Sequence, residues 1–422
     1  MTRDRFILGG AEQFLHPCVG PLLLESAEAK LTLTSTAVAT RGSVRSAVVE
    51  SVLIFVVSRL LIETIGVLVV AINGVPKFSR PGLFGTYFNW DSGFYECIVL
   101  HGYGGAGCEQ SGIDGRMAFF PGYPLVSRAV AWVLGLGSVS SGTDAALWLV
   151  CLLASIVAAV MLYLVTLRSH SRQAARGSVA LMLLGPYGCF LVTSYAEALF
   201  LAFGLTAWWC AAQRRYLLAG IFGAAAAFTR INGVFLAVAL LLMYVVTERS
   251  AGRRIRLRAV LSLSLAFLGT VSYFVWLATM TGRLTSWFDV QQGLWKRHFQ
   301  LPWLTFYRQG GKVLHAPSPD WRAQYVIEGL YAVVLVTLLI LMIRRRWWPA
   351  AAYTFLTMAS LMTSSDYQSL ARNSLLIFPV YVILASYLDS TKRRWVFWVA
   401  LVFGVLLLCF NSVQFALGRW AD

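Results

Sequence analysis

The chain has 422 residues, of which 58% are hydrophobic and only 13% are charged, and its mean hydropathy is +0.68. One globular core cannot hide so many apolar residues, so the composition excludes a soluble domain and predicts an all-α polytopic membrane protein. The net charge of +16 lies largely in short arginine runs between apolar segments, which favours membrane topology and anionic lipid over nucleic acid.

The N-terminal residues 1–47 hold no apolar run long enough to cross a bilayer. They also lack the apolar core and cleavage pattern of a removable signal peptide. We expect a cytoplasmic lead that is a candidate for disorder, and a start codon assigned too early is the alternative. Residues 48–414 are predicted to form the transmembrane domain, and residues 415–422 a short external tail.

Apolar runs predict about eleven transmembrane helices. The runs cover about 48–72, 144–167, 176–193, 195–212, 217–231, 233–247, 258–281, 324–343, 347–363, 373–388 and 395–414. A further apolar stretch, 122–136, is short for a crossing and begins with Pro-Gly-Tyr-Pro. We expect this stretch to lie on the outer surface.

Basic connections support this count. With the N-terminus inside, the predicted cytoplasmic connections are the basic clusters around 168–176, 213–215, 248–258, 344–346 and 389–394. The first external loop is then 73–143. A second external loop, 282–323, is also basic, which invites a functional explanation.

The first external loop holds Trp90-Asp91, Tyr95, His101-Gly102-Tyr103 and the stretch from Ala118 to Pro124. One interpretation is an interfacial loop whose aromatic residues anchor at headgroup depth while Asp91 is merely solvated. The other is a catalytic carboxylate beside an aromatic wall that holds a sugar ring.

The cysteines give no metal pattern, since no CxxC or Cys/His cluster has metal spacing, and no cofactor is expected, although a divalent metal stays open. Cys97 and Cys108 both lie in the first external loop, where an oxidising compartment would permit a disulfide between them.

Further polar residues fall on the same predicted side. They are Glu197, Arg230, Asn232, Trp295, Lys296, Arg297, His298 and Arg372. Each has a structural explanation: an ion pair between Glu197 and Arg230, snorkelling of Lys296 and Arg372 to headgroups, or an interhelical hydrogen bond from Asn232. These structural explanations account poorly for the placement of all these residues on one side of the membrane.

Transfer of a group from a lipid phosphate would suit such a face. Arg230, Arg372, Lys296 or Arg297 would neutralise the phosphate leaving group, and Asp91 would accept the proton of the acceptor hydroxyl. A single dominant carboxylate favours direct displacement with inversion, by analogy with glycosidases. The absence of a nucleotide-binding motif in the sequence favours a lipid-linked donor.

Four segments of the sequence resemble those of a known family. The first external loop, Tyr195-Ala196-Glu197-Ala198-Leu199-Phe200, Thr229-Arg230-Ile231-Asn232-Gly233 and the segment from Arg372 to Pro379 are similar, in order, to blocks of the PIG-V family. That family comprises the second mannosyltransferase of glycosylphosphatidylinositol assembly and its bacterial relatives. Residues 50–385 are covered. Two departures are Ser92-Gly93 in place of an Asp-x-Asp motif, and Ala198 where the family has Ser.

The resemblance implies a GT-C glycosyltransferase fold, a polyprenyl-phosphate-mannose donor and Asp91 as catalytic carboxylate. Short loops and a composition rich in Arg and Ala suggest a bacterial plasma-membrane member, for which an envelope lipid or glycan is the expected acceptor. The predicted topology puts its site on the extracytoplasmic face. Trp90, Tyr95, His101, Tyr103, Glu197, Asn232, Trp295 and His298 are the expected substrate contacts. The alternative is a lipid or glycolipid transporter with Glu197 and Arg230 in its pathway.

Overall fold

The structure, a computed structural model, describes residues 29–74, 88–104, 114–136, 140–365 and 367–419, with side chains described from residue 44 onward. The chain divides into two units, residues 1–45 and 46–422. The predicted N-terminal lead is only partly covered, because residues 1–28 lie outside the described residues, while the helix α1 begins at Ala29. The site lies in the second unit.

The described residues form helices and no β-strand; a single isolated antiparallel bridge joins Phe299 to Ser364. The α-helices are α1 Ala29–Asn73, α2 Asp91–His101, α3 Gly122–Val133, α4 Ser140–Leu167, α5 Arg172–Leu183, α6 Glu197–Ala212, α7 Tyr216–Thr229, α8 Gly233–Ser250, α9 Leu257–Ser264, α10 Leu268–Thr281, α11 Ser286–Trp295, α12 Pro302–Leu314, α13 Pro319–Arg344, α14 Trp348–Met362, α15 Leu370–Asn373, α16 Pro379–Ala385 and α17 Arg394–Ala416. Short 3₁₀ helices are η2 Gly115–Ala118, η3 Gly188–Leu191, η4 Leu265–Phe267, η5 Ser374–Leu376 and η6 Ser386–Asp389.

Each of the eleven predicted apolar runs coincides with one helix or with consecutive helices. Six spans among the described residues are long and apolar enough to cross a membrane, or seven if the pair bent by 78° around Pro379 is one span. The six are Val44–Asn73, Ser140–Leu167, Gly233–Ser250, Leu257–Thr281, Pro319–Arg344 and Arg394–Ala416. The prediction of an all-α membrane protein is confirmed.

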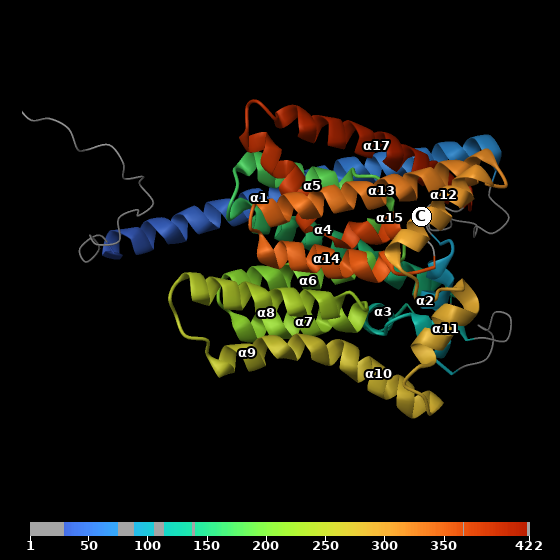
Figure 1. Cartoon of the computed structure of the whole chain (residues 1–422), viewed down its shortest axis with the longest axis horizontal. Coiled ribbons are helices and arrows are strands. Elements are labelled where there is room, and N and C mark those ends of the chain that lie inside the picture. Colours follow the sequence, from blue (N-terminus) through green and yellow to red (C-terminus); the bar gives the residue numbers. More distant parts are fainter. Residues whose placement is uncertain (1–28, 75–87, 105–113, 137–139, 366, 420–422) are drawn as a thin grey trace, which may run out of the picture. The chain divides into compact units, whose positions relative to one another are not determined.

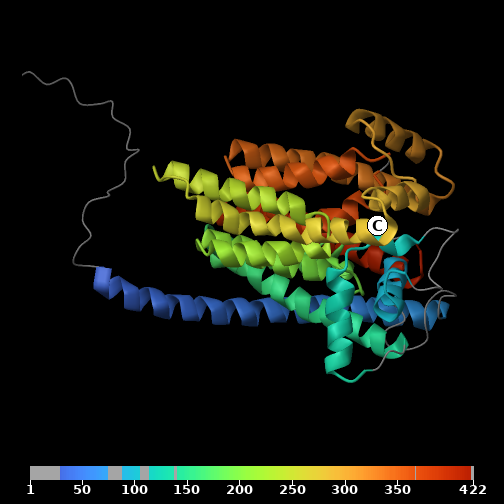
Figure 2. The same ribbon diagram turned by 90° about the horizontal axis from the view of Figure 1, so that it is seen from below.

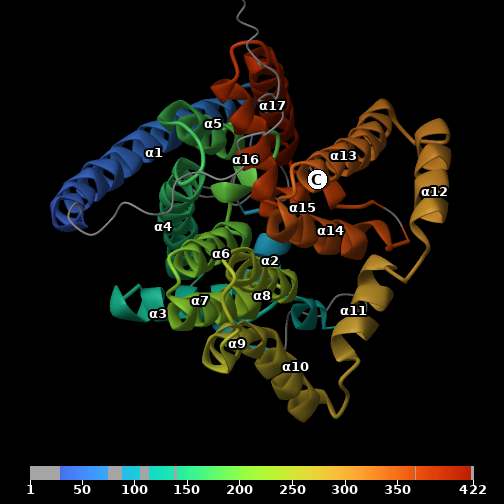
Figure 3. The same ribbon diagram turned by 60° about the vertical axis from the view of Figure 1, so that its left-hand side comes forward.

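The other runs correspond to shorter helices for physical reasons. The run 176–193 breaks because Gly185 and Pro186 follow the end of α5 at Leu183. The helices α6 and α7 have 16 and 14 residues, or about 24 and 21 Å, which is less than the hydrocarbon thickness of a typical bilayer. They pack against neighbours along their length, and α7, α8 and α9 lie side by side (Figures 1 and 3).

The short helix α3 matches the predicted surface stretch 122–136. It has 12 residues, and it leaves Leu125, Trp132 and Val133 exposed. Figure 2 shows α2 and α3 running across the direction of the long helices. Both therefore cap one end of the bundle.

The basic connections gather at the opposite end of the bundle. His170 Nδ1 lies 3.0 Å from Asp389 Oδ2, Arg345 bonds to Ser386, and Arg214 lies 3.7 Å from Glu248. Figure 1 shows the α8–α9 and α16–α17 connections at one end, and α2, α3 and α11 at the other. The 18 residues of α8 separate the two ends by about 27 Å.

Candidate active site

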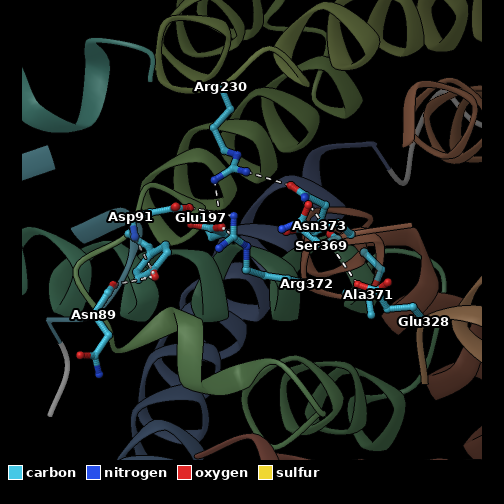
Figure 4. A network of polar contacts seen from close by, with 12 residues as sticks. Asn89, Asp91, Glu197, Arg230, Glu328, Ser369, Ala371, Arg372 and Asn373 are labelled. Carbon is cyan, nitrogen blue, oxygen red and sulfur yellow. Dashed lines mark hydrogen bonds and ion pairs between the residues drawn. The ribbon is translucent and has the colours of Figure 1, made fainter. Parts of the chain in front are cut away.

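Four charged side chains meet at the end of the bundle that α2 and α3 cap (Figure 4). Asp91 is the first residue of α2, Glu197 is the first residue of α6, Arg230 directly follows α7, and Arg372 lies in α15. The residues come from four segments that are distant in sequence. A helix N-terminus favours a negative charge, which suits the positions of both carboxylates.

Arg372 bridges the two carboxylates. Its Nη2 lies 2.9 Å from Asp91 Oδ2, and its Nε lies 3.5 Å from Glu197 Oε1. Arg230 Nη1 approaches the same Glu197 oxygen at 2.9 Å. The two positive and two negative charges balance, so the cluster is formally neutral before any anionic ligand arrives.

Exposure separates the two carboxylates. Glu197 is completely buried, whereas the side chain of Asp91 is 20% exposed and that of Arg230 is 16% exposed. Asp91 Oδ1 has no partner among the described residues, since Arg372 engages only Oδ2. Glu197 is thus placed to hold the arginines electrostatically, and Asp91 to meet a ligand.

The backbone before Asp91 is strained, and Tyr195, just before α6, holds it by hydrogen bonds. Trp90 has φ 58° and ψ −114°, a conformation that residues with a Cβ rarely adopt. The Tyr195 hydroxyl donates to the Asn89 carbonyl at 2.9 Å and accepts the Asp91 N–H at 3.3 Å. The Tyr195 ring also lies under the Arg372 guanidinium, at 5.3 Å. One tyrosine therefore positions both members of the Asp91–Arg372 pair.

Arg230 lies in a turn that depends on close contact between two helices. Arg230 Nη2 donates to Asn373 Oδ1 at 2.8 Å. Gly233 opens α8, and a Cβ there would come within 2.1 Å of the Ala227 Cα in α7. Only glycine permits this approach of the two helices around the Arg230 turn.

The Gly233→Ala substitution should therefore lower the melting temperature and the yield of folded protein, since backbone must shift to admit the methyl group. Thermal unfolding of the purified protein measures the effect. Gly310→Ala is the matched control, because a Cβ at Gly310 in α12 meets nothing within 4 Å. Equal melting temperatures for both variants would contradict this account.

The basic segment 282–323 docks beside the stretch that leads to Arg372. Arg297 Nη2 donates to the Gln368 carbonyl at 3.2 Å, and Ser365 donates to the Lys296 carbonyl. His298 Nδ1 lies 3.1 Å from the Lys296 carbonyl oxygen. These residues thus border the segment carrying Arg372.

The predicted aromatic residues divide into two groups. Trp90 is 47% exposed beside Asp91, and Trp295 packs against Phe94 with ring centroids 5.9 Å apart. Tyr95 is buried against Phe119 and Tyr123. Burial raises the pKa of the Tyr95 phenol above its usual range, so the hydroxyl stays protonated and the residue supports α2.

The remaining predicted contacts lie near the same helices. Tyr103 is buried, donates to the Phe119 carbonyl and packs edge-on against Trp276. His101 is exposed at the end of α2, and Asn232 is buried directly before α8. Tyr103 thus lies within the aromatic packing beneath the first loop.

Of the two cysteines in the predicted disulfide, the structure describes only Cys97. Cys97 is buried in α2 and disulfide-bonded, whereas Cys108 lies outside the described residues. The pairing of Cys97 with Cys108 stays a prediction.

Sequence reasoning missed three residues that organise the cluster: Tyr195, as a hydroxyl bridge, Asn373 and Glu328. Glu328 had a usable signal, because it is a lone carboxylate in the predicted span 324–343, and buried ionisable residues in such segments serve a purpose as a rule. Tyr195 and Asn373 lie inside the quoted motifs, but the motifs indicated no role for either side chain.

Comparisons with known proteins bear on the fold and on about a third of the sequence. No family model matches the chain. The chain is 32% identical over 158 residues to mouse GPI alpha-1,6-mannosyltransferase 2, a match covering 36% of this chain and 30% of the mouse protein. The structure of ArnT from Cupriavidus metallidurans bound to undecaprenyl phosphate superposes with a TM-score of 0.50 at 15% identity, covering 91% of this chain and 64% of ArnT.

The chain thus spans less than two thirds of the length of either relative. The likeness to ArnT concerns the fold, and the likeness to the mouse protein concerns the sequence of about a third of the chain. Both agree with the resemblance carried by the four ordered motifs. The chain is an integral membrane protein that shares the GT-C fold of ArnT, and over about a third of its length its sequence is similar to the mouse mannosyltransferase.

Proposed function

We propose that the chain is a glycosyltransferase that moves a sugar, mannose, from a polyprenyl-phosphate donor to a hydroxyl of a lipid or glycan acceptor. The reaction takes place on the extracytoplasmic face of a bacterial plasma membrane. The observation that carries the proposal is the accessible carboxylate of Asp91 held beside the paired guanidinium groups of Arg372 and Arg230.

The donor class follows from the charges. A polyprenyl phosphate leaves as a membrane-tethered anion, and two arginines at one site suit bidentate recognition of phosphate oxygens. ArnT, which shares the fold, has been captured with undecaprenyl phosphate, and the mouse relative is named as a mannosyltransferase. These names support a polyprenyl-phosphate donor and mannose as the first sugar to test.

The reaction is a single displacement. The acceptor oxygen forms a bond to the anomeric carbon, the bond from that carbon to the phosphate oxygen breaks, and the electron pair stays on the phosphate. The acceptor proton passes to Asp91, whose Oδ1 is unengaged among the described residues. Attack opposite the leaving group inverts the anomeric configuration.

Donor binding would redistribute the arginine contacts. Both guanidinium groups already face carboxylates, so an incoming phosphate competes with Asp91 and Glu197 for them. Movement of Arg372 toward the phosphate releases Asp91 Oδ2 and leaves the carboxylate free to act as a base. Lys296 and Arg297, beside the segment leading to Arg372, would offset the added negative charge.

The orientation rests on charge. The basic connections around 168–176, 213–215, 248–258, 344–346 and 389–394 lie at the end of the bundle opposite Asp91, and such connections are typically cytoplasmic. This distribution supports the proposal that the Asp91 end faces the outside, where a lipid-linked donor is the available activated sugar.

The test uses purified protein in proteoliposomes with radiolabelled polyprenyl-phosphate mannose and lipid extract from the source membranes as acceptor. We expect a labelled glycolipid or glycan and an equal amount of released polyprenyl phosphate. Donors carrying other sugars, run in parallel, establish the preference. Movement of the lipid between leaflets without any new glycosidic bond would favour the transporter alternative and overturn the proposal.

A further inference from the structure

A buried carboxylate outside the four-charge cluster contacts the backbone that presents Arg372. Glu328, in α13, is 3% exposed, and its Oε1 accepts the N–H of Ser369 at 2.9 Å. Burial of a carboxylate is costly unless hydrogen bonds compensate for lost water. Its hydrogen bond with the Ser369 amide therefore indicates a specific use.

Ser369 has a conformation that needs support. Its φ is 63° and its ψ is 14°, the left-handed region that residues with a Cβ disfavour. Ser369 directly precedes α15, so its backbone angles set the direction in which that short helix and Arg372 leave the loop. The contact from Glu328 restrains the residue at which this direction is decided.

The same turn also reaches the second arginine (Figure 4). The Ser369 carbonyl accepts the Asn373 side-chain amide at 2.8 Å. This bond orients the amide so that Asn373 Oδ1 accepts from Arg230 Nη2 at 2.8 Å. Displacement of Ser369 would therefore move both guanidinium groups relative to Asp91 and Glu197.

We infer that Glu328 is a positioning residue that clamps the left-handed Ser369 turn and so sets where Arg372 and Arg230 meet the donor phosphate. The inference rests on the proposed function. Glu328 acts through the Ser369 amide and the α15 turn, at one remove from the reacting atoms.

A structural role in packing α13 against α15 is the competing explanation, since Leu370 and Leu335 also bury surface between these helices. Three substitutions separate the explanations. Glu328→Gln keeps an oxygen acceptor of the same shape, and Glu328→Ala removes it. Ser369→Gly supplies a residue that adopts positive φ without strain and so depends less on the clamp.

We expect Glu328→Ala to raise the KM for polyprenyl-phosphate mannose and to lower kcat/KM by about 10- to 100-fold, because small misplacement of binding groups has effects of this size. Glu328→Gln should stay within about threefold of the parent. Adding Ser369→Gly to Glu328→Ala should recover much of the lost kcat/KM, whereas lost helix packing would not be rescued by a glycine at position 369.

Amide hydrogen exchange measures how firmly Glu328 holds the Ser369 turn, independently of any activity assay. The peptide containing Ser369 to Asn373 should exchange faster in Glu328→Ala and at the parental rate in Glu328→Gln. The matched control is Glu248→Ala, which removes another buried carboxylate, 5% exposed, at the opposite end of the bundle. It should leave the exchange of this peptide and the donor KM unchanged.

Failure of the inference differs from failure of the proposed function. If the parent protein transfers sugar while Glu328→Ala keeps parental KM and exchange, the inference alone is wrong. The inference is equally wrong if Gln and Ala reduce activity to the same extent, in step with melting temperature and without rescue by Ser369→Gly. A parent protein that forms no glycosidic bond removes the proposed function itself.

Discussion

Asp91→Asn should lower kcat for sugar transfer by about 10²- to 10⁴-fold, the range for loss of a general base. The amide matches the carboxylate in shape but cannot take the proton of the acceptor hydroxyl. Arg372 loses its ion pair with Asp91 and keeps its ion pair with Glu197 at 3.5 Å. The variant should therefore fold normally and still bind the donor. Initial rates with labelled donor at saturation measure the loss.

The control for this substitution is Asp289→Asn in the neighbouring helix α11. Asp289 forms an exposed ion pair with Arg283 at 3.2 Å, and exposed pairs contribute little to stability. This variant should transfer sugar at the parental rate. Near-parental kcat for a well-folded Asp91→Asn protein would remove Asp91 from the mechanism and require another base.

Glu197→Ala should be the most destabilising single change at the site, at about 3–5 kcal/mol, because it removes the buried carboxylate that faces both arginines. Glu197 is completely buried and faces both Arg230 and Arg372. We expect a lower yield and a large fall in melting temperature. Thermal unfolding in one detergent, followed by tryptophan fluorescence, measures the change.

A double variant distinguishes charge loss from packing loss. Replacing the pair with apolar residues of similar volume, Glu197→Leu with Arg230→Met, removes both buried charges, and such replacements are often neutral for stability. The double variant should melt well above Glu197→Ala and yet transfer no sugar, since Arg230, one of the two arginines proposed to bind the phosphate, is gone. A Glu197→Ala protein as stable as the parent would show that Glu197 does not offset the arginine charges.

The hydropathy pattern predicted where the helices lie better than where they break. The run 258–281 became the continuous span Leu257–Thr281, and 122–136 became the short surface helix α3. The runs 176–193 and 373–388 were read as unbroken although Pro186 and Pro379 lie in them. Proline removes a backbone donor and bends or ends a helix, and this local signal was available.

The sequence alone determined the membrane class, the helical architecture and the candidate charged residues, because apolar runs, basic connections and lone polar residues in apolar surroundings are local properties of the chain. Only the tertiary structure decided which charges meet. Asp91 and Arg372 are 281 positions apart, and neither spacing nor hydropathy shows that Arg372 bridges Asp91 and Glu197. Helix packing also decided the strained turns at Trp90 and Ser369 and the contacts of Tyr195 and Glu328 that hold them. Such long-range contacts depend on the rotation and depth of each helix, which no local sequence pattern records.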